Sequence, residues 1–290
     1  MKNIKLSFII ILSIILYSCE KTVDNVDVPQ QEPKLVVHCY ISPEDSIINA
    51  YVYLSVPIFS YYDLDNYTPV TNAIVKISDF SNEAQLLYNG FDRYTISANS
   101  FPILPGNNYR LSVSAPGYTS VEGFCKVPLY MNQTLQLLSV DSVKIDDYNY
   151  EYKYKTQFID NNGEGDFYRI AGNMVIVYTY DSMYADTFSN ILYPKYGQEY
   201  FSDKTKDGEK ILSELNYYKY YYEDKINSEE EIISLCFILL TTDEHYYKFH
   251  KSLSNYTGDD PFSEPTIVYS NIENGLGVFG AYRKYVIDYY

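Results

Sequence analysis

The sequence predicts a mainly β protein, with an N-terminal β-sandwich of the immunoglobulin or transthyretin kind followed by a larger antiparallel β domain that carries one short helix. Three observations lead to this prediction. Short segments of alternating apolar and polar residues recur along the chain, turn residues such as Pro-Gly pairs separate them, and a helical spacing of apolar residues stands out in one segment near the C-terminus. Short strands with turn residues between them are typical of sandwiches.

The N-terminal segment predicts a lipoprotein signal peptide over residues 1–18. Lys2 and Lys5 precede an apolar run that is shorter than the roughly 20 residues a membrane-spanning helix needs. The run ends in LYSC, residues 16–19, which has the apolar, small and cysteine positions of a lipobox. We interpret Cys19 as the lipidation site, where acyl chains such as palmitate hold the protein on a membrane. The alternative is an ordinary secretory signal followed by a chance cysteine.

Residues 19–32 are polar, contain a proline and predict a lipidated tether. Residues 33–130 form the predicted N-terminal sandwich. Its strand signals are KLVVHCYI (34–41), INAYVYLSV (48–56), NAIVKIS (72–78), NYRLSVSA (108–115) and TSVEGFCKV (119–127). The segment ILPGNNYRLSVSAPGYTSVEG also looks like transthyretin-like or carboxypeptidase-regulatory-like modules, in which a Pro-Gly turn leads into a strand that ends at Gly-Tyr.

Residues 131–290 form the predicted C-terminal antiparallel domain. Its clearest strand is YNYEYKYKTQFID, in which side chains alternate with a period of two. One face carries Tyr148, Tyr150, Tyr152, Tyr154 and Phe158, and the other carries Asn149, Glu151, Lys153, Lys155 and Gln157. We expect the aromatic face to be buried and the charged face to be hydrated. Further strands are expected within 167–180, 231–242, 265–272 and 278–290.

A helix is predicted near residues 242–255. Thr241 and Glu244 have the spacing of a capping box, in which the first side chain caps the start of the helix. Gly258 and Pro261 follow and close the region. The apolar stripe of this helix consists of Tyr246, Phe249 and Leu253.

Without residues 1–18 the chain retains three cysteines, and an odd number does not make a disulfide framework. Cys39 and Cys125 each share a strand face with aliphatic residues, so both are expected to point inward in the first domain. They could form a disulfide with each other or serve as small buried hydrophobic residues. Cys236 lies in the apolar segment EIISLCFILL and is expected in the core.

Charge excludes one class of partner. The formal net charge is −16, and it becomes −18 without residues 1–18, which hold two lysines and no acidic residue. A chain with this net charge does not show the basic surface that binds the phosphates of nucleic acids, and we expect no nucleic-acid partner. Anionic lipid surfaces repel it too, which leaves the acyl anchor on Cys19 to hold it at a membrane.

The sequence predicts no metal site and no cofactor. His245 and His250 lie about 140° apart around a helix, on different faces, and no HExxH motif is present. His38, the third histidine, lies opposite Cys39 on its strand and is expected at the surface.

The segment DNNGEGD resembles the first half of a calcium loop, with Asp160, Asn162 and Glu164 at alternate positions. Its twelfth position is Ala171, however, where a calcium loop has a bidentate glutamate. A hairpin turn explains the same residues, because Asn and Gly tolerate a positive φ.

No catalytic motif is visible, so we expect no catalytic residues and no enzyme. The sequence contains neither a GxSxG elbow nor a phosphate-binding loop. The segment NGLGVFG, residues 274–280, lacks the GxGxxG spacing and precedes a strand. Its glycines are expected to serve a turn and a close backbone approach.

Tyrosine is frequent, with 36 residues in a chain that has no tryptophan. Exposed tyrosine clusters can form binding surfaces, for a glycan or small molecule as well as for a protein, although the absence of tryptophan argues against a glycan platform. The densest run is NYYKYYYED, and its tyrosines are a candidate partner contact: Tyr217, Tyr218, Tyr220, Tyr221 and Tyr222. The alternative is that tyrosines fill half-hydrated sheet faces, which their strand propensity favours.

Four segments resemble successive signatures of one family: DNNGEGDFYRI, YFSDKTKDGEKI, LLTTDEHYYKFHKSL and DPFSEPTIVYSNIENGLGVFGAY. The family is the one catalogued as domain of unknown function 4249, found in lipoproteins of Bacteroidota. The lipobox followed by PKLVVHCYIS is similar to the start of that family as well. The resemblance implies an outer-membrane lipoprotein, often encoded beside TonB-dependent receptors. It carries over no catalytic or binding residues.

We therefore expect a non-catalytic lipoprotein of the outer membrane, on its periplasmic or its cell-surface side. It would bind a ligand or partner beside an outer-membrane β-barrel receptor. The alternatives are a secreted hydrolase whose site is not visible in motifs and a structural or adhesive surface protein.

Overall fold

The computed structural model describes residues 32–56, 68–146, 149–163, 165–181, 184–204, 207–220, 229–256 and 267–289. Residues 33–290 form one compact unit. Strands dominate this unit and its described residues contain one helix, so the predicted mainly β fold class is confirmed. No helix within these ranges is long and apolar enough to cross a membrane. Cys19 and the expected signal peptide lie outside the described residues.

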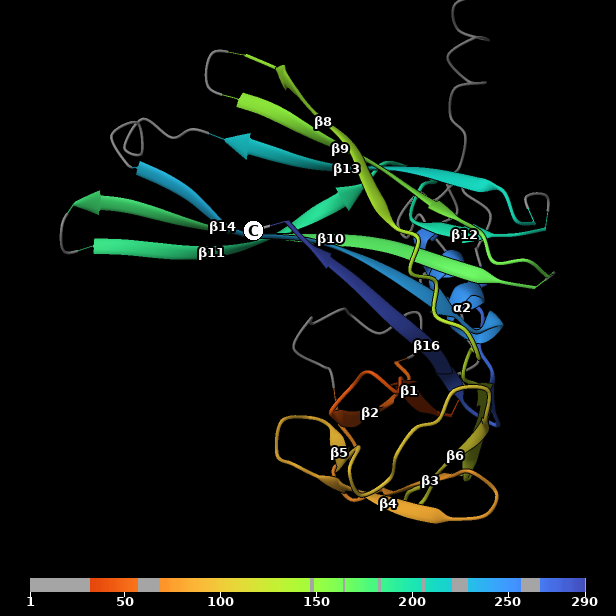
Figure 1. The fold of residues 1–290 in the computed structure, drawn as a ribbon. Helices are drawn as coiled ribbons and strands as arrows, with labels where there is room; N and C mark the ends of the chain where they lie inside the picture. The colour runs from red at the N-terminus through yellow and green to blue at the C-terminus, as the bar shows by residue number, and fades with distance from the viewer. Residues whose placement is uncertain are drawn as a thin grey trace, which may run out of the picture. The chain divides into compact units, whose positions relative to one another are not determined.

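The first seven strands surround one hydrophobic core. They are β1 (Leu35–Ile41), β2 (Ile47–Leu54), β3 (Ile74–Ser78), β4 (Glu83–Tyr88), β5 (Tyr94–Ser97), β6 (Asn108–Ser114) and β7 (Val121–Lys126). β1, β2 and β5 pair in one sheet, and β3, β6 and β7 pair in a second. β4 pairs with β5 of the first sheet and with β3 of the second. Figure 1 shows these strands as two layers.

The core between these layers follows from the alternation in the sequence. Every second residue of Leu35–Ile41 is buried, as are Tyr109 and Val113 on β6. Alternate side chains point to opposite faces of a strand, so each strand gives one apolar face to the core. Cys39 and Cys125 both point into this core, as predicted, and both are free thiols. Burial raises the pKa of both thiols, which is typical of small buried hydrophobic residues.

The remaining strands are β8 (Gln136–Lys144), β9 (Asn149–Ile159), β10 (Phe167–Asp181), β11 (Tyr184–Pro194), β12 (Tyr200–Ser202), β13 (Lys210–Tyr220), β14 (Glu229–Thr242), β15 (Ile272–Glu273) and β16 (Leu276–Asp288). β8, β9 and β13 form one layer, and β10, β12, β14 and β16 form another. β11 pairs with β10 and, at its end, with β13. Figure 1 shows these layers. Residues from both of them, including Phe158 and Phe237, form a second core.

The tyrosine-rich strand β9 has the predicted orientation. Tyr154 and Phe158 are buried in the second core, and Tyr152 packs against it. On the other face, Lys155 is exposed and its Nζ lies 2.9 Å from the carboxylate of Asp141. Alternation with a period of two therefore identified the buried face correctly.

Cys236 on β14 is less buried than the sequence suggested. It is half-buried, because its neighbours Leu235 and Phe237 occupy the face toward the second core. β14 is apolar on both faces, so an uninterrupted apolar run did not reveal which side chains point inward.

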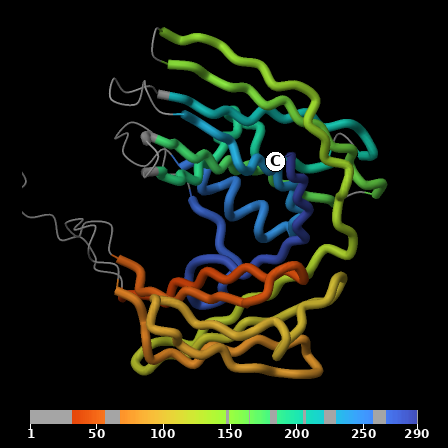
Figure 2. The backbone as a smooth tube through the Cα atoms, turned by 60° about the vertical axis from the view of Figure 1, so that its left-hand side comes forward, coloured from red at the N-terminus to blue at the C-terminus, as the bar shows by residue number. Residues whose placement is uncertain are grey.

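Strand β16 belongs to both cores. Its residues 276–281 run parallel to β1, whereas residues 282–288 run antiparallel to β14. Phe279 lies in the first core and Ile287 packs against the second. Figure 2 shows the N-terminal strands, in red, next to the blue C-terminal strand. The expected division into domains 33–130 and 131–290 stays a prediction. The first core is completed by β16, which lies beyond the expected boundary at residue 130.

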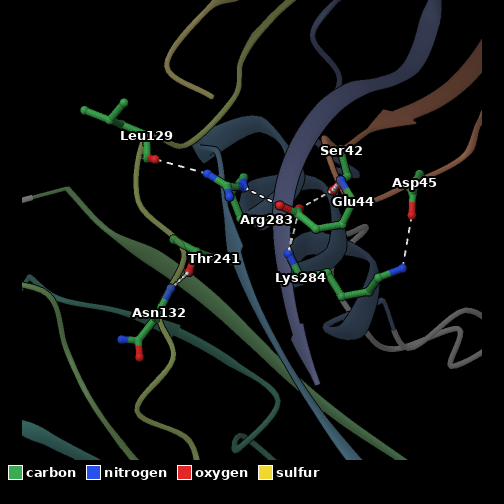
Figure 3. Close-up of polar contacts among 8 residues, drawn as sticks. All are labelled: Ser42, Glu44, Asp45, Leu129, Asn132, Thr241, Arg283 and Lys284. Atoms are coloured by element: carbon green, nitrogen blue, oxygen red, sulfur yellow. Dashed lines mark hydrogen bonds and ion pairs between the residues drawn. The ribbon is translucent and has the colours of Figure 1, made fainter. Parts of the chain in front are cut away.

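A polar cluster fixes β16 to the turn between β1 and β2 (Figure 3). Glu44 accepts a hydrogen bond from Nε of Arg283 at 2.7 Å and another from the backbone N–H of Lys284 at 3.1 Å. The side chain of Lys284 donates to Asp45 at 3.1 Å. Arg283 also donates to the backbone carbonyl of Leu129 at 3.1 Å. The cluster therefore joins three segments that are far apart in the sequence.

Helix α2 spans Glu244–Ser254, but its cap differs from the predicted capping box. Asp243 is the N-cap, and its side chain accepts a hydrogen bond from the backbone N–H of Tyr246 at 2.8 Å. Thr241 instead lies in β14, where its hydroxyl accepts a hydrogen bond from the backbone N–H of Asn132 at 3.1 Å (Figure 3). Pairing with β16 keeps this part of β14 extended, so the helix begins later than the capping box requires.

The apolar stripe of α2 is shorter than predicted. Tyr246 and Phe249 are buried, whereas Leu253 is 46% exposed. In the last turn of α2, the residue that contacts another segment is Ser252. Its hydroxyl accepts a hydrogen bond from the backbone N–H of Tyr269 at 2.8 Å. Leu253 therefore points away from the packed side.

The glycines of NGLGVFG serve the roles that the sequence predicted. Gly277 has a φ of +107°, and a Cβ there would lie 2.1 Å from the carbonyl oxygen of Val37. A Cβ at Gly280 would lie 3.1 Å from the Cβ of Tyr246 in α2. These glycines let β16 approach β1 on one side and the helix on the other.

We expect Gly277→Ala to lower the free energy of unfolding by at least about 3 kcal/mol, because its methyl group would overlap Val37 and alanine rarely adopts this φ. Gly117→Ala is the matched control. Its φ is +84°, but nothing lies within 4 Å of the added Cβ, so a loss of about 1–2 kcal/mol is expected. Urea denaturation measures both, and equal losses would contradict the close approach of β16 to β1.

Candidate functional site

Helix α2 packs on strands β1, β10 and β16 through an aromatic contact surface. The ring of Tyr246 lies 5.2 Å from that of Tyr40, and the ring of Phe249 lies 5.4 Å from that of His38. His38 was expected at the surface, and this expectation is wrong. The outward face of β1 is covered by α2, and burial lowers the pKa of His38.

Arg169 links β10 to α2. Its guanidinium binds the carboxylate of Glu199, with Nε and Nη2 both 2.9 Å from Oε1, and its Nη1 donates to the hydroxyl of Tyr246 at 2.8 Å. The centre of the guanidinium lies 5.4 Å from the ring centroid of Tyr200, an attractive arrangement. Glu199 balances the charge of Arg169. This Arg169 cluster (Arg169, Glu199, Tyr200 and Tyr246) therefore holds α2 against the sheet without a net charge.

His250 fills the space between three tyrosine rings. Its ring centroid lies 5.3 Å from that of Tyr40, 6.0 Å from that of Tyr200 and 4.4 Å from that of Tyr246. Its Nε2 is buried without a hydrogen-bond partner. Burial, followed by the nearby charge of Arg169, lowers the pKa of His250 to about 4. The imidazole is therefore neutral at pH 7.

His245 lies on a different face of α2, as predicted. Its Nδ1 is 2.7 Å from the hydroxyl of Tyr269, away from the contacts of His250. The two helix histidines therefore do not form a pair of metal ligands. In the part of the chain that the structure describes, no group of three or more His, Cys, Asp or Glu residues is arranged to hold a metal ion.

A cavity of about 260 Å³ opens beside the Arg169 cluster, at the C-terminal end of α2. It is lined by the end of β11, the start of β12, the connection between them and the end of the helix. The lining residues are Pro194, residues 195–197, Glu199, Tyr200, Lys251, Ser254 and Asn255. Figure 1 places α2 beside β12, where this connection ends. Glu199 and Tyr200 belong to the cavity and to the Arg169 cluster, so the cluster fixes one wall of the cavity.

The loop DNNGEGD connects β9 with β10, which lie in different layers and pair with other strands, so it is not the hairpin turn that the sequence suggested. Gly165 has a φ of +104°, and its N–H donates to the carboxylate of Asp203 at 2.6 Å. Asp160 accepts a hydrogen bond from the N–H of Gly208 at 2.9 Å. The carboxylates thus tie two loops together through backbone hydrogen bonds. Glu164 lies outside the described residues.

The structure places two of the candidate contact tyrosines on opposite faces of β13. Tyr217 packs in the second core and is 9% exposed, so its ring is not free to contact a partner. Tyr218 points outward and is 38% exposed. The side chain of Tyr220, and both Tyr221 and Tyr222, lie outside the described residues.

The sequence did not reveal the cavity or the Arg169 cluster. Arg169 is 30 positions from Glu199 and 77 positions from Tyr246, and no local pattern connects them. The sequence feature that could have pointed to the cavity is Lys251, a cationic residue in the last turn of a predicted helix.

Comparison with known proteins identifies the family. The profile of the family described as domain of unknown function (DUF4249) matches residues 22–287. The chain belongs to this family. The four motifs that resembled DUF4249 therefore identified it correctly, and the family description assigns no activity. No curated protein matches this DUF4249 chain.

Lowering the pH from 7 to 4.5 should reduce the contribution of His250 to the stability of the DUF4249 chain. The folded-state pKa is about 4, below the ordinary value of about 6.5. Between these values the unfolded chain binds more protons, so acidification favours unfolding. His250→Phe keeps an aromatic ring and removes this titration. Between pH 7 and pH 4.5 the free energy of unfolding of the variant should therefore change by about 2 kcal/mol in the stabilising direction relative to wild type.

Urea unfolding of both proteins at pH 7 and pH 4.5 measures this difference. Asp243, whose pKa burial raises to about 7, works in the opposite direction, but it is present in both proteins and cancels in the comparison. An identical change in stability between the two pH values in wild type and His250→Phe would show that the imidazole is not buried as described.

Proposed function

We propose that this protein is a non-catalytic binding protein, anchored to the outer membrane through lipid on Cys19, that works beside a receptor of the TonB-dependent type. The observation that supports a binding role is the cavity at the end of α2, whose wall is held in place by the Arg169 cluster. A preformed cavity with a few polar groups is typical of ligand sites.

The side chains around the cavity favour binding over catalysis. A general base needs a free lone pair near the reacting atom and a pKa close to the working pH. Glu199 is bound to Arg169, and Lys195 lies 3.3 Å from the carboxylate of Glu214. His250 is packed among tyrosine rings with a lowered pKa. None of these groups is placed to exchange protons with a bound molecule.

A lipid anchor would keep the folded unit near its partner. The sequence places 13 residues between Cys19 and the folded unit, and a flexible linker of that length has a reach of about 20 Å. Confinement over such a distance raises the effective concentration of a membrane partner to roughly millimolar. Weak contacts then suffice for a functional complex.

The candidate receptor contact is a row of side chains that runs across β13, β9 and β8, and β8 is the edge strand of this layer. Tyr218 on β13 lies opposite Glu151 on β9, which lies opposite Val143 on β8. Residues opposite each other in antiparallel strands share a face, and Tyr218 and Val143 are 38% and 45% exposed. In the described part of the chain β8 has β9 as its strand neighbour on one side and none on the other. Such an edge can pair with another chain.

The lipid anchor is tested by the mature N-terminus. We expect mass spectrometry of the protein from native membranes to find an acylated Cys19 as its first residue. Cys19→Ser should abolish acylation and leave the precursor uncleaved, because the peptidase acts on the lipidated cysteine. An unmodified N-terminus at another residue would exclude this anchor.

The receptor contact is tested by crosslinking in native membranes. Wild type should be trapped with an outer-membrane β-barrel receptor, and the double variant Tyr218→Ala, Val143→Ser should reduce the yield several-fold because it removes both exposed contacts. Tyr130→Ala is the control, since Tyr130 is 70% exposed and lies outside this row. If the double variant crosslinks as well as Tyr130→Ala, the row is not the contact, and if wild type traps no receptor, the accessory role is wrong.

A further inference from the structure

We infer that the cavity at the end of α2 binds a monosaccharide that carries a carboxylate, of the uronic acid class. The inference rests on the proposed binding role, but it depends on neither the lipid anchor nor the receptor. Four properties of the cavity support it: its size, an exposed aromatic ring, the polar groups at the helix end and the balance of charge.

The size of the cavity favours a single sugar ring. Its volume is about 260 Å³, just below the range of about 300–1,000 Å³ that holds drug-sized ligands. A nucleotide or an acyl chain needs more room, whereas one pyranose ring with its substituents fits. The relevant class is therefore a small, compact ligand.

An exposed tyrosine provides a surface on which a sugar ring can pack. Tyr196 is 94% exposed in the connection between β11 and β12 and lines the cavity. Covering an exposed aromatic ring with the C–H face of a pyranose is favourable, because both surfaces are amphipathic. Tyr200 forms the neighbouring wall and is held by His250, with a ring separation of 6.0 Å and an angle of 10°. One wall is therefore held by ring packing, and the other presents an exposed ring to the ligand.

The end of α2 offers partners for sugar hydroxyl groups. The last four carbonyl groups of a helix lack intrahelical donors, and Ser254 satisfies that of Lys251 with a hydrogen bond of 2.9 Å. The hydroxyl oxygen of Ser254 can still accept, and the side-chain amide of Asn255 both donates and accepts. Hydroxyl groups, which also donate and accept, match this mixture better than an apolar ligand does.

The charges that line the cavity leave one positive group for the ligand. Glu199 is neutralised by Arg169, and Lys195 is paired with Glu214. Lys251 forms no ion pair with another residue of the described ranges, so its ammonium group is available to a carboxylate. The partial negative charge at a helix C-terminus opposes any negative charge on the ligand, and it opposes a dianion about twice as strongly as a monoanion. A monoanionic carboxylate is therefore favoured over a phosphate dianion.

The test uses the full-length protein in detergent and saturation-transfer NMR with three probes: D-glucuronate, D-glucose and acetate. We expect glucuronate to bind with a Kd about tenfold lower than that of glucose, because it adds the contact with Lys251. Acetate lacks the ring and should give no signal. The preference for glucuronate should shrink as salt is raised, because salt screens a partly exposed charge pair.

Two variants assign the contacts. Lys251→Met should raise the Kd for glucuronate about tenfold, to that for glucose, and leave glucose unaffected. Tyr196→Ala should weaken both sugars. Lys248→Met is the matched control, because Lys248 lies on the same helix, outside the cavity lining, and pairs with Glu244 at 2.8 Å. Binding in this control should equal that of wild type.

The outcomes separate this inference from the proposed function. If glucuronate and glucose bind equally and Tyr196→Ala weakens both, the carboxylate is wrong and a binding role stands. If glucuronate binds but neither Lys251→Met nor Tyr196→Ala changes its Kd, the cavity is the wrong site. If neither sugar binds at millimolar concentration, the inference is overturned, and the crosslinking experiment still decides the accessory role.

Discussion

The parallel pairing of β16 with β1 is the constraint on which the rest of the structure depends. It carries the C-terminal strand from the first core into the second, so that one strand supplies side chains to both. The pairing is close because Gly277 has no side chain where the backbone of Val37 passes. The ion pairs of Glu44 and Asp45 with Arg283 and Lys284 then fix the strand at the point where it changes partners.

The position of the cavity follows from that strand. Gly280 allows Tyr246 to lie directly against β16, and Tyr246 in turn binds Arg169. Arg169 and Glu199 are joined through two guanidinium nitrogens at 2.9 Å, with side chains that are 30% and 27% exposed, so the pair holds this wall more firmly than a fully exposed ion pair would. The wall that this pair forms is therefore rigid. A rigid wall beside an exposed loop residue such as Tyr196 is an arrangement suited to a small ligand, because little of the protein must be ordered when the ligand binds.

Features set by neighbours in the chain could be predicted from the sequence. The buried face of β9 follows from strict alternation of tyrosines with charged residues, and the inward direction of Cys39 and Cys125 follows from the aliphatic residues two positions away. The glycines around Gly277 were assigned to a close backbone approach because their spacing fits no phosphate-binding loop. In each case the local pattern already contains the physical cause.

Features set by distant segments could not be predicted. His38 looked exposed because nothing near it in the sequence shows that α2 covers the outer face of β1. Thr241 looked like a helix cap because its strand pairing with β16 is not visible locally. Lys251 and Tyr196 meet at one cavity through the packing of a helix on a loop more than fifty positions earlier in the sequence. Such contacts depend on the tertiary fold, which local periodicity does not encode.

The shared strand also sets the order in which this chain can acquire its structure. Domains of a growing or exported chain usually fold from the N-terminus onward, but here β1 lacks one of its two neighbours until residues 276–281 arrive. Closing so long a loop is slow, since its entropy must be lost before the contacts form. The N-terminal sandwich therefore stays incomplete while most of the chain is delivered. A chain that lacks β16 would leave β1 and β14 each without a strand neighbour and would expose parts of both cores to proteases.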